Sequence, residues 1–175
     1  MWRTLGLAGA MGLLAACSTA ERPSTGAEAA GSVSGPLVDG TGKTVGTVAL
    51  RQGSAGGSIR VAVEGLAPGQ HGMHLHEVGK CEGPKFQSAG GHWNWTGKQH
   101  GHQNPAGHHA GDLGNLTVGA DGKGRRDVTV DGAEWAGQHD RGLALVVHAA
   151  ADDERTDPSG NSGDRIACGV LFPGS

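Results

Sequence analysis

Short runs rich in β-branched residues recur along this chain, and sequences typical of turns separate them. Asp39-Gly40-Thr41-Gly42 and Asp121-Gly122-Lys123-Gly124 have the Asp-Gly composition that favours tight hairpin turns. Glycine accounts for 34 of the 175 residues, against a usual share of about 7%, and no helical period is sustained. The pattern predicts an all-β sandwich or barrel, with strands near residues 33–37, 44–51, 58–65, 72–78, 115–118, 126–130, 143–149 and 165–172.

A chain of 175 residues is expected to form one domain. Two long stretches, residues 79–114 and 152–164, show no hydrophobic period and should be loops. Loops of such length inside a compact domain are usually functional. The candidate site should therefore be sought in these two segments.

The first 16 residues have the features of a secretory signal peptide. Arg3 is their only charge, and the apolar run 5–16 is shorter than the roughly 20 residues that span a membrane. The run ends in Leu14-Ala15-Ala16-Cys17, which resembles the lipobox of bacterial lipoproteins, where the cysteine is acylated. Ser18 follows and, by the same resemblance, favours the outer membrane. The alternative is an ordinary signal peptide cut elsewhere, with Cys17 incidental.

The predicted organisation is a lipoprotein signal peptide (1–16), a lipidated Cys17 with a flexible tether (17–31), and a folded domain (32–175). Residues 18–31 are small and polar, which suits a tether. We therefore expect a periplasmic protein of the bacterial cell envelope, attached to the outer membrane by acylation of Cys17. Removal of Arg3 leaves 14 − 1 = 13 basic against 17 acidic residues, so nothing suggests nucleic acid binding.

If Cys17 is lipidated, Cys81 and Cys168 remain as an even pair in an exported chain. Such a pair is expected to form a disulfide. The alternative is two free buried thiols. The loop that the disulfide would close has a sequence separation of 168 − 81 = 87.

Ten histidines in one domain of this size is a high number, and most of them lie between His71 and His109. His74-Leu75-His76 lies in a strand-like run, where successive side chains point to opposite faces. The two imidazoles should therefore share one face, while Leu75 points into the core. Two ligands on one strand are a preorganised start for a metal site.

The histidines divide into two predicted ligand sets that share one member. Three histidines and an aspartate form a closed N3O set, which suits structural zinc. Four imidazoles suit copper. The zinc set is His92, His100, His109 and Asp112, and the copper set is His74, His76, His92 and His148. His92 would then bind through both ring nitrogens, as an imidazolate bridge between one copper and one zinc ion per chain.

Five segments resemble motifs of the copper/zinc superoxide dismutases: residues 72–77 (GMHLHE), 88–94 (SAGGHWN), 111–115 (GDLGN), 145–148 (LVVH) and 165–170 (RIACGV). The likeness runs from about residue 32 to the end, and its loop lengths are similar to those of the bacterial periplasmic branch. It implies an eight-stranded Greek-key β-barrel or sandwich of immunoglobulin-like architecture with two long functional loops. It also implies conversion of superoxide to oxygen and hydrogen peroxide.

The same resemblance implies roles for individual residues. When copper is reduced, the His92 nitrogen that faces it would leave the metal and take up a proton. Arg165 would attract and position the superoxide anion. Asp152 would accept hydrogen bonds from His74 and His100. His71 would brace the site through backbone contacts without binding metal.

The charges near Arg165 depart from the family pattern, because Asp164 is its neighbour and the loop before it is rich in acidic residues. Weaker steering of an anion is expected, with Lys80, Lys85 and Lys98 as candidates to restore it. The alternative function is a non-enzymatic copper- and zinc-binding protein of the periplasm. A homodimer is compatible with the sequence, which identifies no interface.

Overall fold

The computed structural model describes residues 1, 31–53, 56–131 and 140–174. Residues 2–30 lie outside this part, so the predicted signal peptide, the lipidation of Cys17 and the tether remain predictions. No helix within the described ranges is long and apolar enough to cross a membrane.

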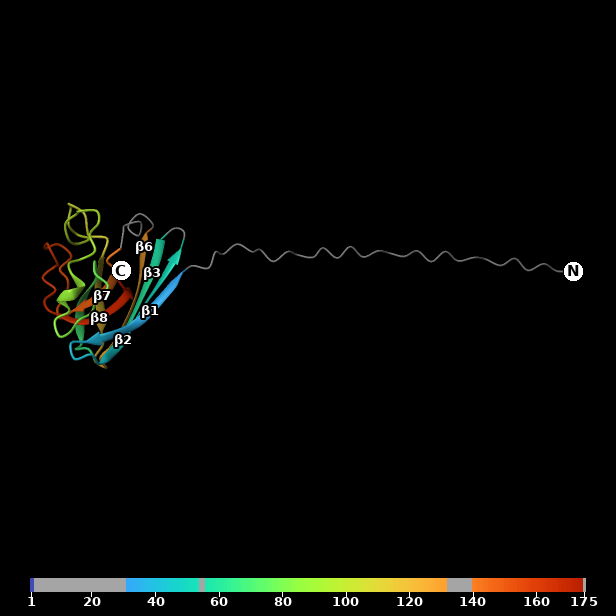
Figure 1. Cartoon of the computed structure of the whole chain (residues 1–175), viewed down its shortest axis with the longest axis horizontal. Coiled ribbons are helices and arrows are strands. Elements are labelled where there is room, and N and C mark those ends of the chain that lie inside the picture. Colours follow the sequence, from blue (N-terminus) through green and yellow to red (C-terminus); the bar gives the residue numbers. More distant parts are fainter. Residues whose placement is uncertain (2–30, 54–55, 132–139, 175) are drawn as a thin grey trace.

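Eight antiparallel strands form a closed barrel in the order β1-β2-β3-β6-β5-β4-β7-β8 (Figure 1). This confirms the predicted all-β fold, and the strands lie where the β-branched runs placed them. The described residues contain one short helix, the 3-10 turn η1. The bounds are β1 Ser32–Asp39, β2 Thr44–Gly53, β3 Gly56–Glu64, β4 Gly69–His76, η1 Gln87–Ala89, β5 Asp112–Val118, β6 Lys123–Asp131, β7 Leu143–His148 and β8 Arg165–Phe172.

Strand β4 separates the hydrophobic core from the histidine cluster. Met73 and Leu75 are fully buried and belong to the core inside the barrel. His74 and His76 alternate with them and are therefore directed to the other side of the barrel wall. The predicted direction of Leu75 is confirmed, and the histidine cluster lies outside the barrel, between its wall and the covering loops.

Strand β7 follows the same alternation. Leu145 and Val147 belong to the interior core, whereas Val146 packs in a second cluster with Phe86 and Cys168. That second cluster anchors the first long loop against the barrel wall. His148 continues the outward series and ends the strand beside the loops.

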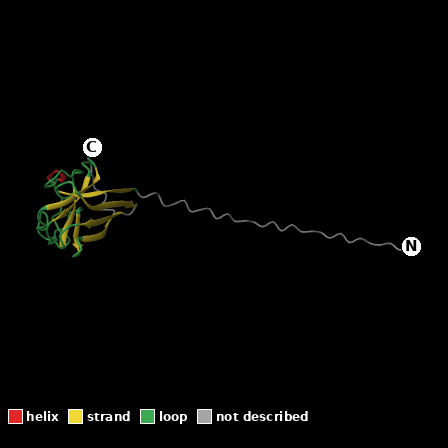
Figure 2. Ribbon diagram, turned by 90° about the horizontal axis from the view of Figure 1, so that it is seen from below, coloured by secondary structure: helices red, strands yellow, loops and turns green. Residues whose placement is uncertain are grey.

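The two long loops, residues 77–111 and 149–164, lie side by side along the barrel, where Figure 2 shows loops gathered outside the wall of strands. The His100 N–H donates to Asp157 Oδ1 at 2.7 Å, and the Gln103 N–H donates to the Glu154 carbonyl at 3.0 Å. The predicted disulfide between Cys81 and Cys168 is present and ties the first loop to β8. Segments distant in sequence are thereby held over one face of β4 and β7.

Candidate metal centre

Three buried histidines and one partly buried histidine, His92, come from three parts of the chain and meet outside the barrel wall. His74 and His76 lie on β4, and His148 ends β7. His92 comes from the first loop and pairs as an isolated bridge with His76. One ligand atom from each of the four lies within 4.8 Å of the others. The structure thus brings together the residues predicted as the copper set.

In each of these four rings, one nitrogen has a hydrogen-bond partner and the other has none among the described residues. The bonded nitrogens, at 2.8 to 3.1 Å, are His74 Nε2 with Asp152, His76 Nδ1 with the Gly90 carbonyl, His92 Nδ1 with Asp112, and His148 Nδ1 with the Gly163 carbonyl. The buried nitrogens without a partner are His74 Nδ1, His76 Nε2, His92 Nε2 and His148 Nε2. A buried polar atom left unpaired costs about 1–3 kcal/mol, so four together are expected only where a ligand satisfies them.

Burial keeps these rings in the neutral form that binds metal. It lowers the pKa of His74 to about 3, although a hydrogen bond to Asp152 opposes the shift. Burial likewise lowers the pKa of His148 to about 4 and holds that of His76 well below its usual value. At neutral pH the lone pairs are therefore free for a metal, and imidazole nitrogen suits copper.

The second predicted set converges on one carboxylate oxygen. Asp112 Oδ1 lies 3.0 Å from His92 Nδ1, 2.9 Å from His100 Nδ1 and 3.3 Å from His109 Nδ1. Ligand atoms of a tetrahedral zinc site, with bonds of about 2.0–2.1 Å, lie about 3.3 Å apart. The N3O set fits zinc, and His92 reaches it through the nitrogen that the copper set does not use.

His74 also lies close to this second set, because its ligand atom is within 4.8 Å of those of His92, His100 and Asp112. We nevertheless assign His109, whose Nδ1 is 3.2 Å from His92 Nδ1 and faces Asp112. Neither nitrogen of His74 is left for the zinc set. Its Nε2 is hydrogen-bonded to Asp152, and its Nδ1 is one of the four unpaired nitrogens of the copper set.

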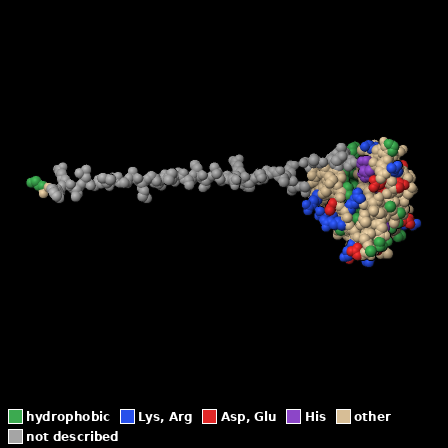
Figure 3. Space-filling model, turned by 180° about the vertical axis from the view of Figure 1, so that it is seen from behind, with side chains coloured by type: hydrophobic (Ala, Val, Ile, Leu, Met, Phe, Trp, Pro, Cys, Tyr) green, Lys and Arg blue, Asp and Glu red, His purple; other side chains and the backbone are tan. Residues whose placement is uncertain are grey.

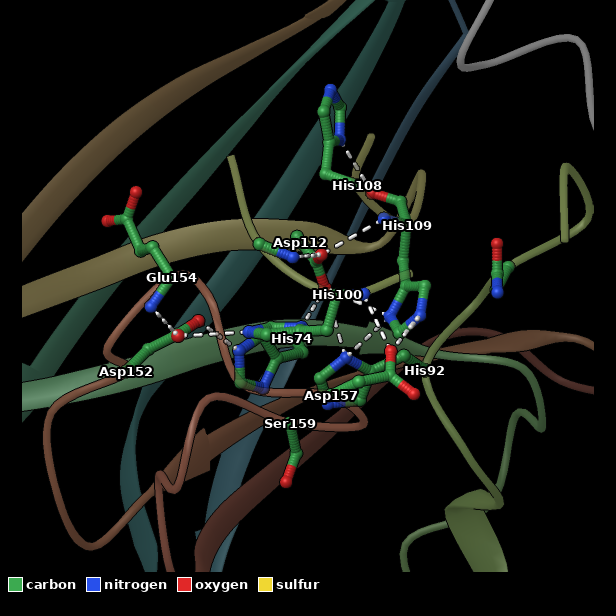
Figure 4. Close-up of polar contacts among 12 residues, drawn as sticks. His74, His92, His100, His108, His109, Asp112, Asp152, Glu154, Asp157 and Ser159 are labelled. Carbon is green, nitrogen blue, oxygen red and sulfur yellow. Dashed lines mark hydrogen bonds and ion pairs between the residues drawn. The ribbon is translucent and has the colours of Figure 1, made fainter. Parts of the chain in front are cut away.

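Two carboxylates hold four of the six rings (Figure 4): Asp112 faces His92, His100 and His109, and Asp152 faces His74 and His100. Asp152 reaches His74 Nε2 at 2.8 Å and His100 Nε2 at 2.9 Å, the two contacts predicted for it. Burial opposes the positive charge of His100, but its hydrogen bonds to Asp112 and Asp152 outweigh burial and raise its pKa to about 9. Gly160, at φ 63°, allows this contact because a Cβ there would overlap the Asp152 carboxylate.

Two further residues support the site from behind. The ring nitrogens of buried His71 lie 2.8 Å from the carbonyls of His148 and Ala67, in keeping with the predicted bracing role. Asn115 was not predicted. Its Oδ1 accepts the Asp152 N–H at 2.7 Å, and its Nδ2 donates to the Asp152 carbonyl at 2.9 Å. The only sequence signal for Asn115 was its place in the GDLGN segment.

Arg165 begins β8 and is fixed by the first loop. Its Nη1 donates to the Phe86 carbonyl and its Nη2 to the Gly90 carbonyl, each at 2.7 Å. Gly90 also accepts from His76, so the guanidinium is tied to the wall of the copper set. Arg165 lines a surface hollow together with Lys85 and Asp164. Of the three predicted lysines, Lys85 is the one that shares this hollow with Arg165.

Two of the histidines without a predicted role, His102 and His108, lie beside the zinc set, where His108 Nδ1 is 2.9 Å from the His109 carbonyl. His102 is 42% exposed, and its ring stacks on that of His108 with centroids 4.4 Å apart. Histidine side chains are visible on the surface in Figure 3. His139 lies outside the described residues.

Fold and site together define a metal-binding antiparallel β-barrel protein. The profile of copper/zinc superoxide dismutase (SODC) matches residues 44–171. The chain therefore belongs to the copper/zinc superoxide dismutase family.

Individual relatives agree with this assignment. The copper/zinc superoxide dismutase of Deinococcus radiodurans is 38% identical over 187 aligned positions, covering 98% of both chains. The superoxide dismutase-like protein YojM of Bacillus subtilis is 44% identical over 146 residues, covering 78% of this chain and 74% of that protein. The crystal structure of the Brucella abortus Cu/Zn superoxide dismutase matches with a TM-score of 0.64 and 33% identity, covering 81% and 99% of the two chains.

Proposed function

We propose that this chain is an active superoxide dismutase holding one copper and one zinc ion. The observation that carries the proposal is the set of four buried, unpaired imidazole nitrogens, with Arg165 tied to the same wall through Gly90. A protein that only sequestered metal would need the nitrogens but not a fixed guanidinium. Family membership supports the same activity.

The reaction converts two superoxide ions and two protons to oxygen and hydrogen peroxide. Copper bound by the four imidazoles would supply the one-electron steps by alternating between Cu(II) and Cu(I). One superoxide is oxidised to oxygen, and the second is reduced and takes up both protons. His92 Nε2 can hold one of these protons, because it has no hydrogen-bond partner among the described residues while Nδ1 keeps its contact with Asp112 of the zinc set. Water supplies the other.

Arg165 is positioned to bind the substrate anion. Two backbone carbonyls hold its guanidinium, which keeps a positive charge at neutral pH and presents further N–H donors to a small anion. Lys85 in the same hollow adds a second positive charge, whereas Asp164 opposes it. We propose that Lys85 partly offsets the acidic residues of the second loop.

We further propose that the protein works in the bacterial periplasm, attached to the outer membrane by acylated Cys17. The support is the sequence of residues 14–18 together with the polar segment before β1. Nothing in this arrangement requires a nucleic acid partner, and a homodimer stays compatible with it.

The first test is activity of the metal-loaded protein. Purified protein loaded with one equivalent each of copper and zinc is expected to remove superoxide in a cytochrome c competition assay, at a rate well above that of free copper. Metal content is measured on the same sample. A fully loaded sample with no activity above the free-copper background would refute the proposed dismutase activity. The non-enzymatic metal-binding protein would then be the remaining candidate.

That second candidate is kept because one relative, YojM, is named only as superoxide dismutase-like. A metal-binding protein without activity would still bind copper at the four nitrogens. Copper retention without turnover would therefore favour it.

Replacing Arg165 by glutamine is expected to lower the rate about tenfold and to flatten its dependence on ionic strength, because electrostatic steering of an anion is screened by salt. The measurement is the dismutase rate at several salt concentrations. Arg60→Gln on β3 removes the same charge from an exposed pair with Asp127 on β6 and serves as the control. If both variants lose the same fraction of the dismutase rate and of its dependence on ionic strength, Arg165 acts only through the net charge of the protein and does not position the anion.

A further inference from the structure

We propose that Asp157 is a positioning residue of the zinc set, which orients His109 and the backbone of His100 as Asp152 orients His74 and the ring of His100. This inference rests on the proposed zinc site at His92, His100, His109 and Asp112. It assigns a second carboxylate of the loop 149–164 to the metal centre.

The ring of His109 lies between two carboxylates. Its Nδ1 faces the zinc set, 3.3 Å from Asp112 Oδ1 and 3.2 Å from His92 Nδ1. Its Nε2 faces outward, 3.6 Å from Asp157 Oδ1. A carboxylate on the outer nitrogen of a metal-binding histidine holds the proton there and leaves the inner lone pair for the metal.

The same oxygen of Asp157 holds a second member of the set. It accepts the His100 backbone N–H at 2.7 Å, and Figure 4 shows the carboxylate directed at both residues. His100 is fully buried and His109 nearly so. A single side chain from the second loop therefore connects two zinc-set residues that lie on the first.

Asp152 leaves this position open for another carboxylate. Its two oxygens are used by His74 and His100, and none of its hydrogen bonds in the described part of the chain reaches His109. The turn between the two aspartates is built by Asp153, whose Oδ1 accepts the N–H groups of Arg155 and Thr156. Asp157 then emerges beside His109, five positions after Asp152.

The expected effect is moderate, for two reasons. The Asp157 side chain is 50% exposed, and its 3.6 Å contact with His109 is longer than a hydrogen bond. Loss of an outer partner of a metal ligand typically costs 10–100-fold in affinity. We therefore expect about a tenfold loss of zinc affinity on removal of the carboxylate.

The test uses the full-length protein with zinc alone, so that it does not depend on dismutase activity. Zinc affinity is measured by competition with a chelator for wild type, Asp157→Ala and Asp157→Asn. Asp157→Ala should bind zinc about tenfold more weakly. Asp157→Asn, which keeps an oxygen acceptor for His100, should recover most of that loss.

A second readout separates orientation of the ring from stability of the loop. In zinc-loaded protein labelled with 15N-histidine, the Nε2–H of His109 should exchange with water faster in Asp157→Ala, whereas that of His100 should stay protected by Asp152. Gln103→Ala removes the side-chain hydrogen bonds of Arg155 to the first loop and leaves the turn before Asp157 intact, so it controls for packing of the two loops. Glu64→Gln, an exposed change on β3, controls for charge.

Zinc affinity of Asp157→Ala within threefold of wild type would overturn the inference, as would an equal loss in Gln103→Ala. Wild type that binds no zinc would refute the proposed site itself and the inference with it. A zinc-binding but inactive wild type would overturn only the proposed activity, and the Asp157 result would still decide the inference.

Discussion

Replacement of His92 by alanine is expected to reduce the dismutase rate by more than 100-fold and to weaken both metal sites. His92 contributes Nδ1 to the group around Asp112 and Nε2 to the four unpaired nitrogens. Its loss removes one ligand from each set. Loss of a group that only hydrogen-bonds a metal ligand typically costs 10–100-fold in metal affinity or activity. Loss of a direct ligand that also carries the proton should therefore cost more.

His109→Ala is the matched comparison for this prediction, because His109 belongs to the zinc set alone. It should lose zinc affinity while copper binding changes little. His102→Ala, at a ring 42% exposed, controls for a histidine of the same loop outside both sets. The dissociation constants for copper and for zinc are measured on each variant, together with the dismutase rate. These three values distinguish the His92, His109 and His102 variants.

A His92→Ala protein that keeps both affinities and a rate within threefold of wild type would contradict the bridge. Loss of zinc binding with copper binding intact would also contradict it, since His92 would then belong to one set only.

Removal of the disulfide, by Cys81→Ser with Cys168→Ala, is expected to lower the free energy of unfolding by about 4.6 kcal/mol, the loop-closure entropy that the chain-entropy model gives for a loop of this length. The covalent link spans a sequence separation of 87. Alanine is chosen at 168 because that position is fully buried, where a polar group is costly unless it is hydrogen-bonded. Denaturant unfolding, followed by tryptophan fluorescence, measures the change.

The same double variant should also lower the dismutase rate. The disulfide holds the loop whose Phe86 and Gly90 carbonyls bind the Arg165 guanidinium. Wild type treated with a reductant provides the comparison without substitutions and should behave alike. If the double variant unfolds at the wild-type denaturant concentration with the wild-type rate, the disulfide neither stabilises the barrel nor positions Arg165.

Much of the fold and the ligand sets could be predicted from the sequence, because they depend on local rules. Period-two alternation places Leu75 in the core and His74 and His76 on the opposite face, and the structure agrees. Glycine-rich turns mark the ends of strands. The Cys81–Cys168 pairing followed from a cysteine count. The acylation of Cys17 and the attachment to a membrane stay predictions.

The tertiary structure alone decided how the strands close and how the loops meet. The neighbours β3–β6 and β4–β7 are not consecutive in sequence, and no local pattern specifies them. Asn115 accepts a hydrogen bond from the backbone of Asp152, 37 residues away. The Phe86 carbonyl accepts one from Arg165, 79 residues away. Asp157 meets His100 across 57 residues.

Sequence by itself therefore determined which side chains can bind metal and which face of each strand carries them, because both depend on residue type and short spacing. The folded structure decided which nitrogen of each histidine remains available and which groups hold the ring in place. The physical reason is that a hydrogen bond to the second nitrogen comes from another segment, which approaches only when the barrel has closed and the two loops have packed together.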